Sequence, residues 1–196
     1  MDEQKKPILT LEYTIQPEEY LHFNQYFAKE NFQAKKNKTT LVGAIETVVA
    51  LILLYATATG EGQYRLMLIL LSAALVAFGL YSMLFYTVIF PWSLKNAARK
   101  NYEKSDYLKN PIRQDFYPDS LVETSQGVEN RFYWNEVSEI RETPILFMLI
   151  LEEKRTILIP KSGLGDQIYE LDECLKLIEQ KYGKQRIGTG CRWQDR

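Results

Sequence analysis

Two long runs of apolar residues dominate the hydropathy pattern, at residues 41–59 and 66–92, and a short polar loop separates them. A helix rises about 1.5 Å per residue and the apolar slab of a bilayer is about 30 Å thick, so each run is long enough to cross once. The first run has one charged residue, Glu46, and the second has none. Neither shows the polar stripe of a soluble core helix. The pattern predicts a transmembrane hairpin over residues 39–94, in preference to a buried helical hairpin.

The segment before the hairpin, residues 1–38, predicts a strand followed by an amphipathic helix. Residues 9–15 alternate apolar and polar side chains, which is typical of a half-buried strand. Pro17 suits the first turn of a helix. Because the basic residues 35–38 directly precede the first apolar run, this helix either lies along an anionic membrane surface or continues into the span.

The segment after the hairpin, residues 95–185, predicts a small antiparallel sheet closed by a helix. Short apolar segments separated by turn residues predict five strands, at 120–125, 128–134, 137–143, 145–151 and 155–159. Asp166 is expected to cap an amphipathic helix that ends before Gly183. Residues 186–196 are polar and are expected to be disordered. If strand 9–15 joins the same sheet, the hairpin is inserted within one split domain; the sequence leaves this open.

Positive charge indicates the orientation of the hairpin. Lysines and arginines lie on both outer flanks, whereas the connecting loop has only Arg65; the flanking residues are Lys29, Lys35, Lys36 and Lys38 before, and Lys95, Arg99, Lys100 and Lys104 after. The excess of positive charge predicts that both termini are cytoplasmic in a multi-pass membrane protein. Pro91 is expected to end or kink the second helix near that surface.

Composition argues against several classes of function. The net charge of −1 over 196 residues disfavours nucleic-acid binding. A single histidine, His22, and two cysteines without ligand spacing, Cys174 and Cys191, predict neither a metal site nor a disulfide framework. There is no phosphate-binding glycine loop and no recognisable nucleophile arrangement, so we expect no enzyme activity and no cofactor.

Glu46 is the candidate polar group within the membrane. In an antiparallel hairpin it comes level with residues 79–82, and we expect Ser82 or Tyr86 to hydrogen-bond its carboxyl group, because an unpaired carboxylate in hydrocarbon is costly. One interpretation is that Glu46 carries a proton or cation. The other, which we favour, is that it reaches the nearby cytoplasmic surface or pins the hairpin.

The same helix has a face of small residues. Gly43, Thr47 and Ala50 lie on it, and Gly79 is the matching small residue of the second helix. Small residues allow membrane helices to approach closely, so this face is expected to meet a protein partner.

The segments Gly127-Val128, 134–137, 145–148 and 157–161 together resemble the C-terminal domain of the YcxB-like family. The resemblance implies a pleckstrin-homology-like (PH-like) fold joined to a two-helix hairpin in a bacterial inner membrane, without an established molecular activity. Ser162-Gly163-Leu164 departs from the family pattern, in which a basic and an aromatic residue are expected. The fold class expected overall is an α+β membrane protein with a PH-like cytoplasmic sheet.

The expected function is that of a membrane-anchored cytoplasmic interaction module. Its partner would be another protein or anionic lipid headgroups, bound through a strand edge or a basic corner. Self-association is the other partnership that the sequence leaves open. Basic residues at strand ends and turns are the candidate headgroup contacts: Arg131, Lys154, Arg155 and Lys161. The alternatives are an oligomeric transport or channel component that uses Glu46, and a stress or toxin-protection factor that occupies a partner at the membrane.

Overall fold

The structure is a computed structural model that describes residues 6–152 and 155–188, without the side chains of residues 33 and 34. It divides into two compact units. One contains the described residues up to Tyr20 and from Lys100 onward, and the other is Leu21–Arg99. The chain therefore leaves a domain, forms a helical hairpin and returns to the same domain.

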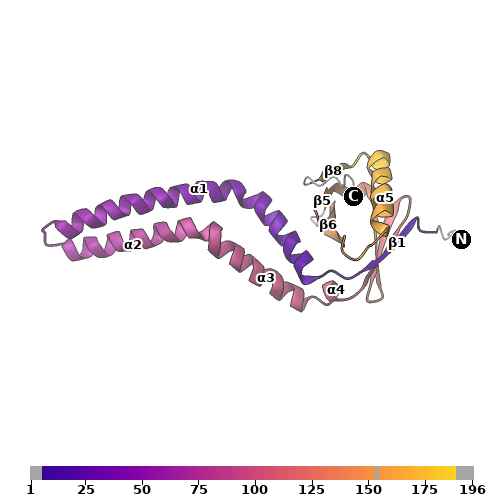
Figure 1. The fold of residues 1–196 in the computed structure, drawn as a ribbon, viewed down its shortest axis with the longest axis horizontal. Helices are drawn as coiled ribbons and strands as arrows, with labels where there is room; N and C mark the ends of the chain where they lie inside the picture. Colours follow the sequence, from indigo (N-terminus) through magenta and orange to yellow (C-terminus); the bar gives the residue numbers. More distant parts are fainter. Residues whose placement is uncertain (1–5, 153–154, 189–196) are drawn as a thin grey trace. The chain divides into compact units, whose positions relative to one another are not determined.

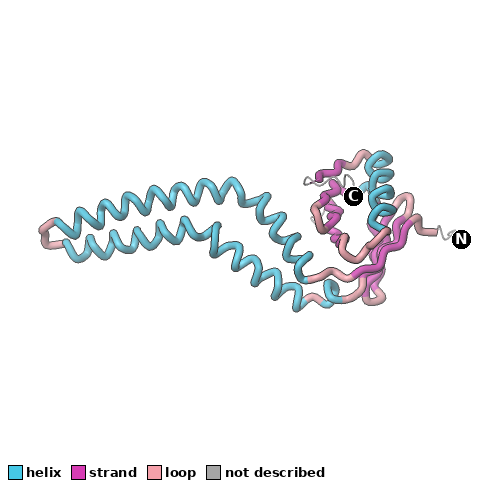
Figure 2. Tube along the Cα trace, in the orientation of Figure 1, coloured by secondary structure: helices cyan, strands magenta, loops and turns pink. Residues whose placement is uncertain are grey.

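The helical unit is built from two long helical segments joined by a short loop (Figure 2). Helix α1 spans Pro17–Thr59 and helix α2 spans Arg65–Leu84. Neither glycine nor proline interrupts α1 between its first turn and Gly43, so nothing in the sequence stops the helix before the apolar run. Of the two alternatives for the N-terminal helix, the structure shows continuation into the first apolar run.

The helix passes through Pro91 instead of ending there. A π-helical segment, Phe85–Ile89, follows α2, and helix α3, Phe90–Lys104, begins one residue before the proline. Proline has no backbone N–H and its ring clashes with the carbonyl four residues earlier. The wider turn, in which the Phe90 N–H donates to the Phe85 carbonyl oxygen, directly precedes this position. The ribbon changes direction there (Figure 1).

The first sheet joins the two ends of the domain. Its strands are β1 (Leu9–Tyr13), β2 (Ile112–Phe116), β3 (Ser120–Ser125) and β4 (Val128–Tyr133), in the order β1-β2-β3-β4. The short helix α4, Asp106–Lys109, leads into β2. Strand β1 pairs antiparallel with β2, from Leu9 opposite Phe116 to Tyr13 opposite Ile112. The domain is therefore split, and the hairpin is inserted between two paired strands.

The second sheet has the order β7-β6-β5-β8. A 3-10 turn, Trp134–Glu136, leads into β5 (Val137–Glu142), which is followed by β6 (Leu146–Leu151) and β7 (Thr156–Pro160). Helix α5, Gln167–Tyr182, precedes β8, Gln185–Gly188, which pairs parallel with β5. The expectation of disorder from residue 186 is therefore wrong for residues 186–188, and residues 189–196 lie outside the described part.

The core of the domain is aromatic and aliphatic. Trp134 is 1% exposed, stacks on Phe116 with ring centroids 5.9 Å apart, and donates its indole N–H to the Tyr117 carbonyl oxygen at 2.9 Å. Helix α5 buries one face in the same core, made of Leu171, Cys174, Leu175 and Ile178. Asp166 precedes this helix without a capping side-chain hydrogen bond. The observed class is α+β, with two long apolar helices and mainly antiparallel sheets.

Candidate functional site

The two long helices approach closely at Gly43 and Gly79. A Cβ atom on Gly43 would lie 2.9 Å from the Gly79 carbonyl oxygen, and one on Gly79 would lie 2.9 Å from the Thr47 backbone nitrogen. Ala50, the next small residue along this face, is 1% exposed. The four predicted packing residues thus lie between the two helices of the hairpin. The partner of the small-residue face is the second helix of the same chain, because the short loop already holds the two helices together.

Glu46 does not make the expected hydrogen bond. Its Oε2 atom is buried without a partner, and within the described residues no hydrogen bond joins it to Ser82 or Tyr86. The reason is the packing of those two residues. Ser82 packs against the backbone of Gly43, whereas the Tyr86 ring joins an aromatic group with Phe32, Phe85 and Phe90.

The apolar side chains of the helical unit are largely exposed in the isolated chain. Two helical segments, Lys35–Thr59 and Arg65–Lys104, are long and apolar enough to cross a membrane. Only 17% and 11% of their most apolar stretches are buried, whereas a core helix of a soluble protein is mostly buried. The exposed residues include Ile45, Val48, Ile52, Leu70, Leu71 and Phe78. An exposed apolar surface of this extent is typical of a face that contacts a membrane or another protein.

The basic residues expected at headgroups are partly used inside the domain. The Lys161 side chain is 6% exposed, lies 2.6 Å from a Glu142 carboxylate oxygen and sits over the Phe147 ring. Arg155 lies over the Phe132 ring and 3.6 Å from the carboxylate of Glu123. Lys161 is therefore not available to a headgroup in this conformation. Arg131 is exposed on β4, and Lys154 lies outside the described residues.

Arg155 has this position because Glu123 is buried on the inner face of the first sheet. Glu123 is 1% exposed, and the Gln114 side-chain amide donates to its Oε2 atom at 3.2 Å. Burial and this carboxylate together raise the pKa of Tyr107, which lies on α4. A buried carboxylate needs a nearby cation. Arg155 supplies that cation from a side chain that is still 48% exposed.

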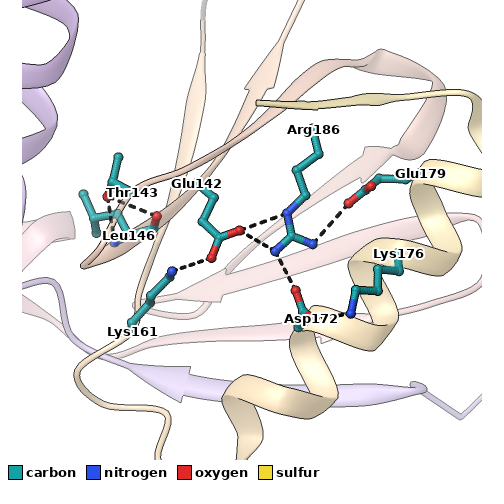
Figure 3. Close-up of polar contacts among 8 residues, drawn as sticks. All are labelled: Glu142, Thr143, Leu146, Lys161, Asp172, Lys176, Glu179 and Arg186. Atoms are coloured by element: carbon teal, nitrogen blue, oxygen red, sulfur yellow. Dashed lines mark hydrogen bonds and ion pairs between the residues drawn. The ribbon is translucent and has the colours of Figure 1, made fainter. Parts of the chain in front are cut away.

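Arg186 organises an ion-pair network that the sequence did not indicate (Figure 3). From β8 its guanidinium bonds Glu142 on β5 and Asp172 and Glu179 on α5. Burial alone would raise the pKa of the Asp172 carboxyl, but hydrogen bonds from Lys176 and Arg186 lower it below its usual value. Ile187 is the one large apolar residue of this segment, and a single such residue is too weak a pattern to predict a strand. The network explains why residues 185–188 are ordered.

Strand β4 is one of the two edge strands of the first sheet, and β1 is the other. Within the described residues β4 pairs only with β3. The Trp134 N–H donates toward β3, to the Asp119 carbonyl oxygen, whereas the Tyr133 N–H donates to the Glu136 side chain. Backbone groups alternate between the two sides of a strand. The N–H and C=O groups of Glu129 and Arg131 therefore face away from β3.

The side chains of β4 are also accessible. Val128 is 59% exposed and Tyr133 is 48% exposed, and both Glu129 and Arg131 are exposed. The preceding turn, Gln126-Gly127, has positive φ at both residues (53° and 77°), as a tight two-residue hairpin requires. This turn aligns β4 firmly on β3. The result is a regular edge on which the outward backbone groups of Glu129 and Arg131 have no partner within residues 6–152 and 155–188.

No group of three or more metal-ligating His, Cys, Asp or Glu side chains occurs in residues 6–152 and 155–188.

Residues 116–175 match the family model described as YcxB-like protein. The match runs from the end of β2 through both sheets into α5. This confirms the YcxB-like resemblance over that stretch. No curated protein matches the chain.

Proposed function

We propose that the chain is a membrane-anchored interaction module. Its hairpin crosses the bilayer twice, and its PH-like domain works at the cytoplasmic surface, where the edge of β4 binds a protein partner. The observation that carries the proposal is the pairing of β1 with β2 on either side of the apolar hairpin.

This pairing restricts the membrane topology. Three residues separate the end of β1 at Tyr13 from the start of α1 at Pro17, and β2 enters the same sheet after the hairpin. A sheet with a polar rim cannot straddle a bilayer, since lipid leaves open strand edges unsatisfied. Both ends of the hairpin therefore belong on one side of the membrane. Two crossings satisfy this condition, whereas one or three do not.

The orientation follows from the flanking charges. Lysines lie on both ends of the hairpin, and Arg65 is the one basic residue of the loop. The positive-inside rule then favours a cytoplasmic domain and an external loop.

Several features support the PH-like part of the proposal. Strands β1–β7 form two antiparallel sheets in chain order, helix α5 follows β7, and the YcxB-like match covers most of this arrangement. The sequence motifs that resemble the YcxB-like family imply the same PH-like fold.

A protein partner is favoured over lipid headgroups by the use of the basic residues. Lys161 is buried against Glu142, and Arg155 neutralises Glu123. The β4 edge, in contrast, offers unpaired backbone groups that suit strand addition.

The topology is tested by labelling single cysteines with a membrane-impermeant maleimide. In a Cys174→Ala, Cys191→Ala background, Gln63→Cys reports the loop and Glu170→Cys reports an exposed position of α5. We expect Gln63→Cys to react in intact cells and Glu170→Cys to react only after lysis. Labelling of both from the same side, or release of the chain by alkaline carbonate, would contradict the proposal.

A second candidate, transport of a proton or cation, rests on the buried and unpartnered Oε2 atom of Glu46. If reconstituted vesicles show a flux that Glu46→Gln abolishes while the protein still inserts, this candidate replaces the first. Unchanged or absent flux favours the interaction module.

A further inference from the structure

We propose that the partner of β4 is β4 of a second copy, paired antiparallel with Asn130 opposite Asn130. This inference rests on the proposed function, because it names the partner of that same edge. It joins two first sheets into one continuous sheet across a twofold axis.

The direction of the backbone groups restricts the pairing. Because Trp134 bonds toward β3 and Tyr133 away from it, the odd-numbered residues of β4 turn their N–H and C=O groups outward. Only these residues can exchange hydrogen bonds with another strand. A second β4 must therefore place its own odd-numbered residues opposite them.

The charges then select one register. Pairing Glu129 with Glu129, or Arg131 with Arg131, sets like charges directly opposite one another, which is destabilising. Pairing Arg131 with Tyr133 uses a tyrosine whose N–H already donates to Glu136. The register centred on Asn130 pairs Glu129 with Arg131 twice. It gives two opposite-charge pairs and four backbone hydrogen bonds.

The inner face of the sheet fits the same register. Val128 lies opposite Phe132 of the second copy, twice, so the exposed aliphatic side chain gains an apolar neighbour. The two Asn130 amides meet at the axis, where each has a donor and an acceptor for the other.

Charged side chains often protect a sheet edge against pairing with another strand, and β4 has two such residues, Glu129 and Arg131. Here the two charges have opposite sign and lie symmetrically about Asn130, so they disfavour the two registers that pair like charges and favour the one that pairs Glu129 with Arg131. The contact is short, and confinement of both copies to one membrane supplies the effective concentration that it needs.

Disulfide trapping in native membranes tests the register. In the cysteine-free background, Asn130→Cys places two sulfurs at a non-hydrogen-bonded pair, with Cα atoms about 4.5 Å apart, within disulfide range. Val128→Cys is the matched control, since it keeps both charges and its two copies lie four residues apart along the strands, about 13 Å, beyond disulfide range. We expect an oxidised dimer with Asn130→Cys and none with Val128→Cys. A dimer with Val128→Cys, or with neither variant, overturns the inference.

Charge reversal provides a second test. It compares two single variants with the double variant, so it does not depend on the folding of one variant alone. Glu129→Arg and Arg131→Glu each place like charges opposite one another and should remove the Asn130→Cys dimer. The double variant restores the opposite-charge pairs and should recover the dimer. Glu170→Lys, at an exposed position of α5, should have no effect. If neither single variant forms the dimer and the double variant does not recover it, the proposed register is wrong. Trapping of the dimer in a chain that carbonate releases supports this inference while refuting the membrane anchor.

Discussion

Gly43 and Gly79 bring the two long helices into backbone contact, so that a Cβ on either residue would collide with the other helix. Nothing lies within 4 Å of a Cβ on Gly62, in the connecting loop. The hairpin is therefore held at one defined crossing point.

Gly79→Val should weaken the hairpin. The new side chain must push α1 and α2 apart, and overpacking of this kind typically costs about 1–3 kcal/mol. Unfolding of the purified chain in detergent, followed by circular dichroism, measures the change in the free energy of unfolding. Gly62→Val is the matched control and should change it little. Equal losses for the two variants would show that the crossing point does not constrain the helices.

Glu46→Leu should stabilise the hairpin. The substitution removes a buried carboxylate oxygen that has no hydrogen-bond partner, and relief of such a group is worth about 1–3 kcal/mol. The same unfolding assay applies, with Glu61→Leu in the exposed loop as the control. A lower stability for Glu46→Leu would mean that the carboxylate has a stabilising partner in the membrane.

Arg186→Ala should release β8 from the domain. The variant removes the cation that Glu142 and Asp172 share, and loss of hydrogen bonds to charged groups at these partly buried positions costs about 1.5–3 kcal/mol. Limited proteolysis should then cut after α5, where the parent chain resists. Arg113→Ala, at a side chain that is 56% exposed, serves as control and should leave the resistance to proteolysis unchanged. Resistance of Arg186→Ala to proteolysis would contradict the role of the network.

The stability of the domain should fall in acid partly through Asp172. Its carboxyl pKa is lowered in the folded chain from an ordinary value of 3.8, so the folded state favours the ionised form. This contribution is fully present above about pH 4 and is lost as the pH falls through the lower, folded value. Asp172→Asn should flatten the pH dependence of unfolding below pH 4 relative to the parent. An unchanged slope would show that the ion pairs contribute nothing there.

The Cys174 thiol should react slowly in the folded domain. Burial raises its pKa from 9.0 to about 11, so the reactive thiolate at pH 8 falls about a hundredfold. Maleimide labelling of the Cys191→Ala variant, before and after denaturation, measures this difference. Rapid labelling of the folded chain would show that α5 opens readily.

The sequence determined the parts of this protein that depend on local pattern. The lengths of the two apolar runs specified the long helices. Alternation at residues 9–15, and short apolar segments separated by turn residues at 120–159, specified most strands. Small residues at matching positions of the two runs specified where the helices meet. The YcxB-like motifs in the later strands were readable for the same reason, since they lie in one continuous stretch.

The tertiary structure decided what depends on distant residues. Strand β2 was missed because the buried position in its middle is polar, Gln114, and only the partner Glu123 explains it. Strand β8 exists because Arg186 meets carboxylates from β5 and α5. The buried position of the Lys161 side chain likewise depends on its ion pair with Glu142. The union of β1 with β2 required the chain to return after nearly a hundred residues, and no local periodicity records such a return.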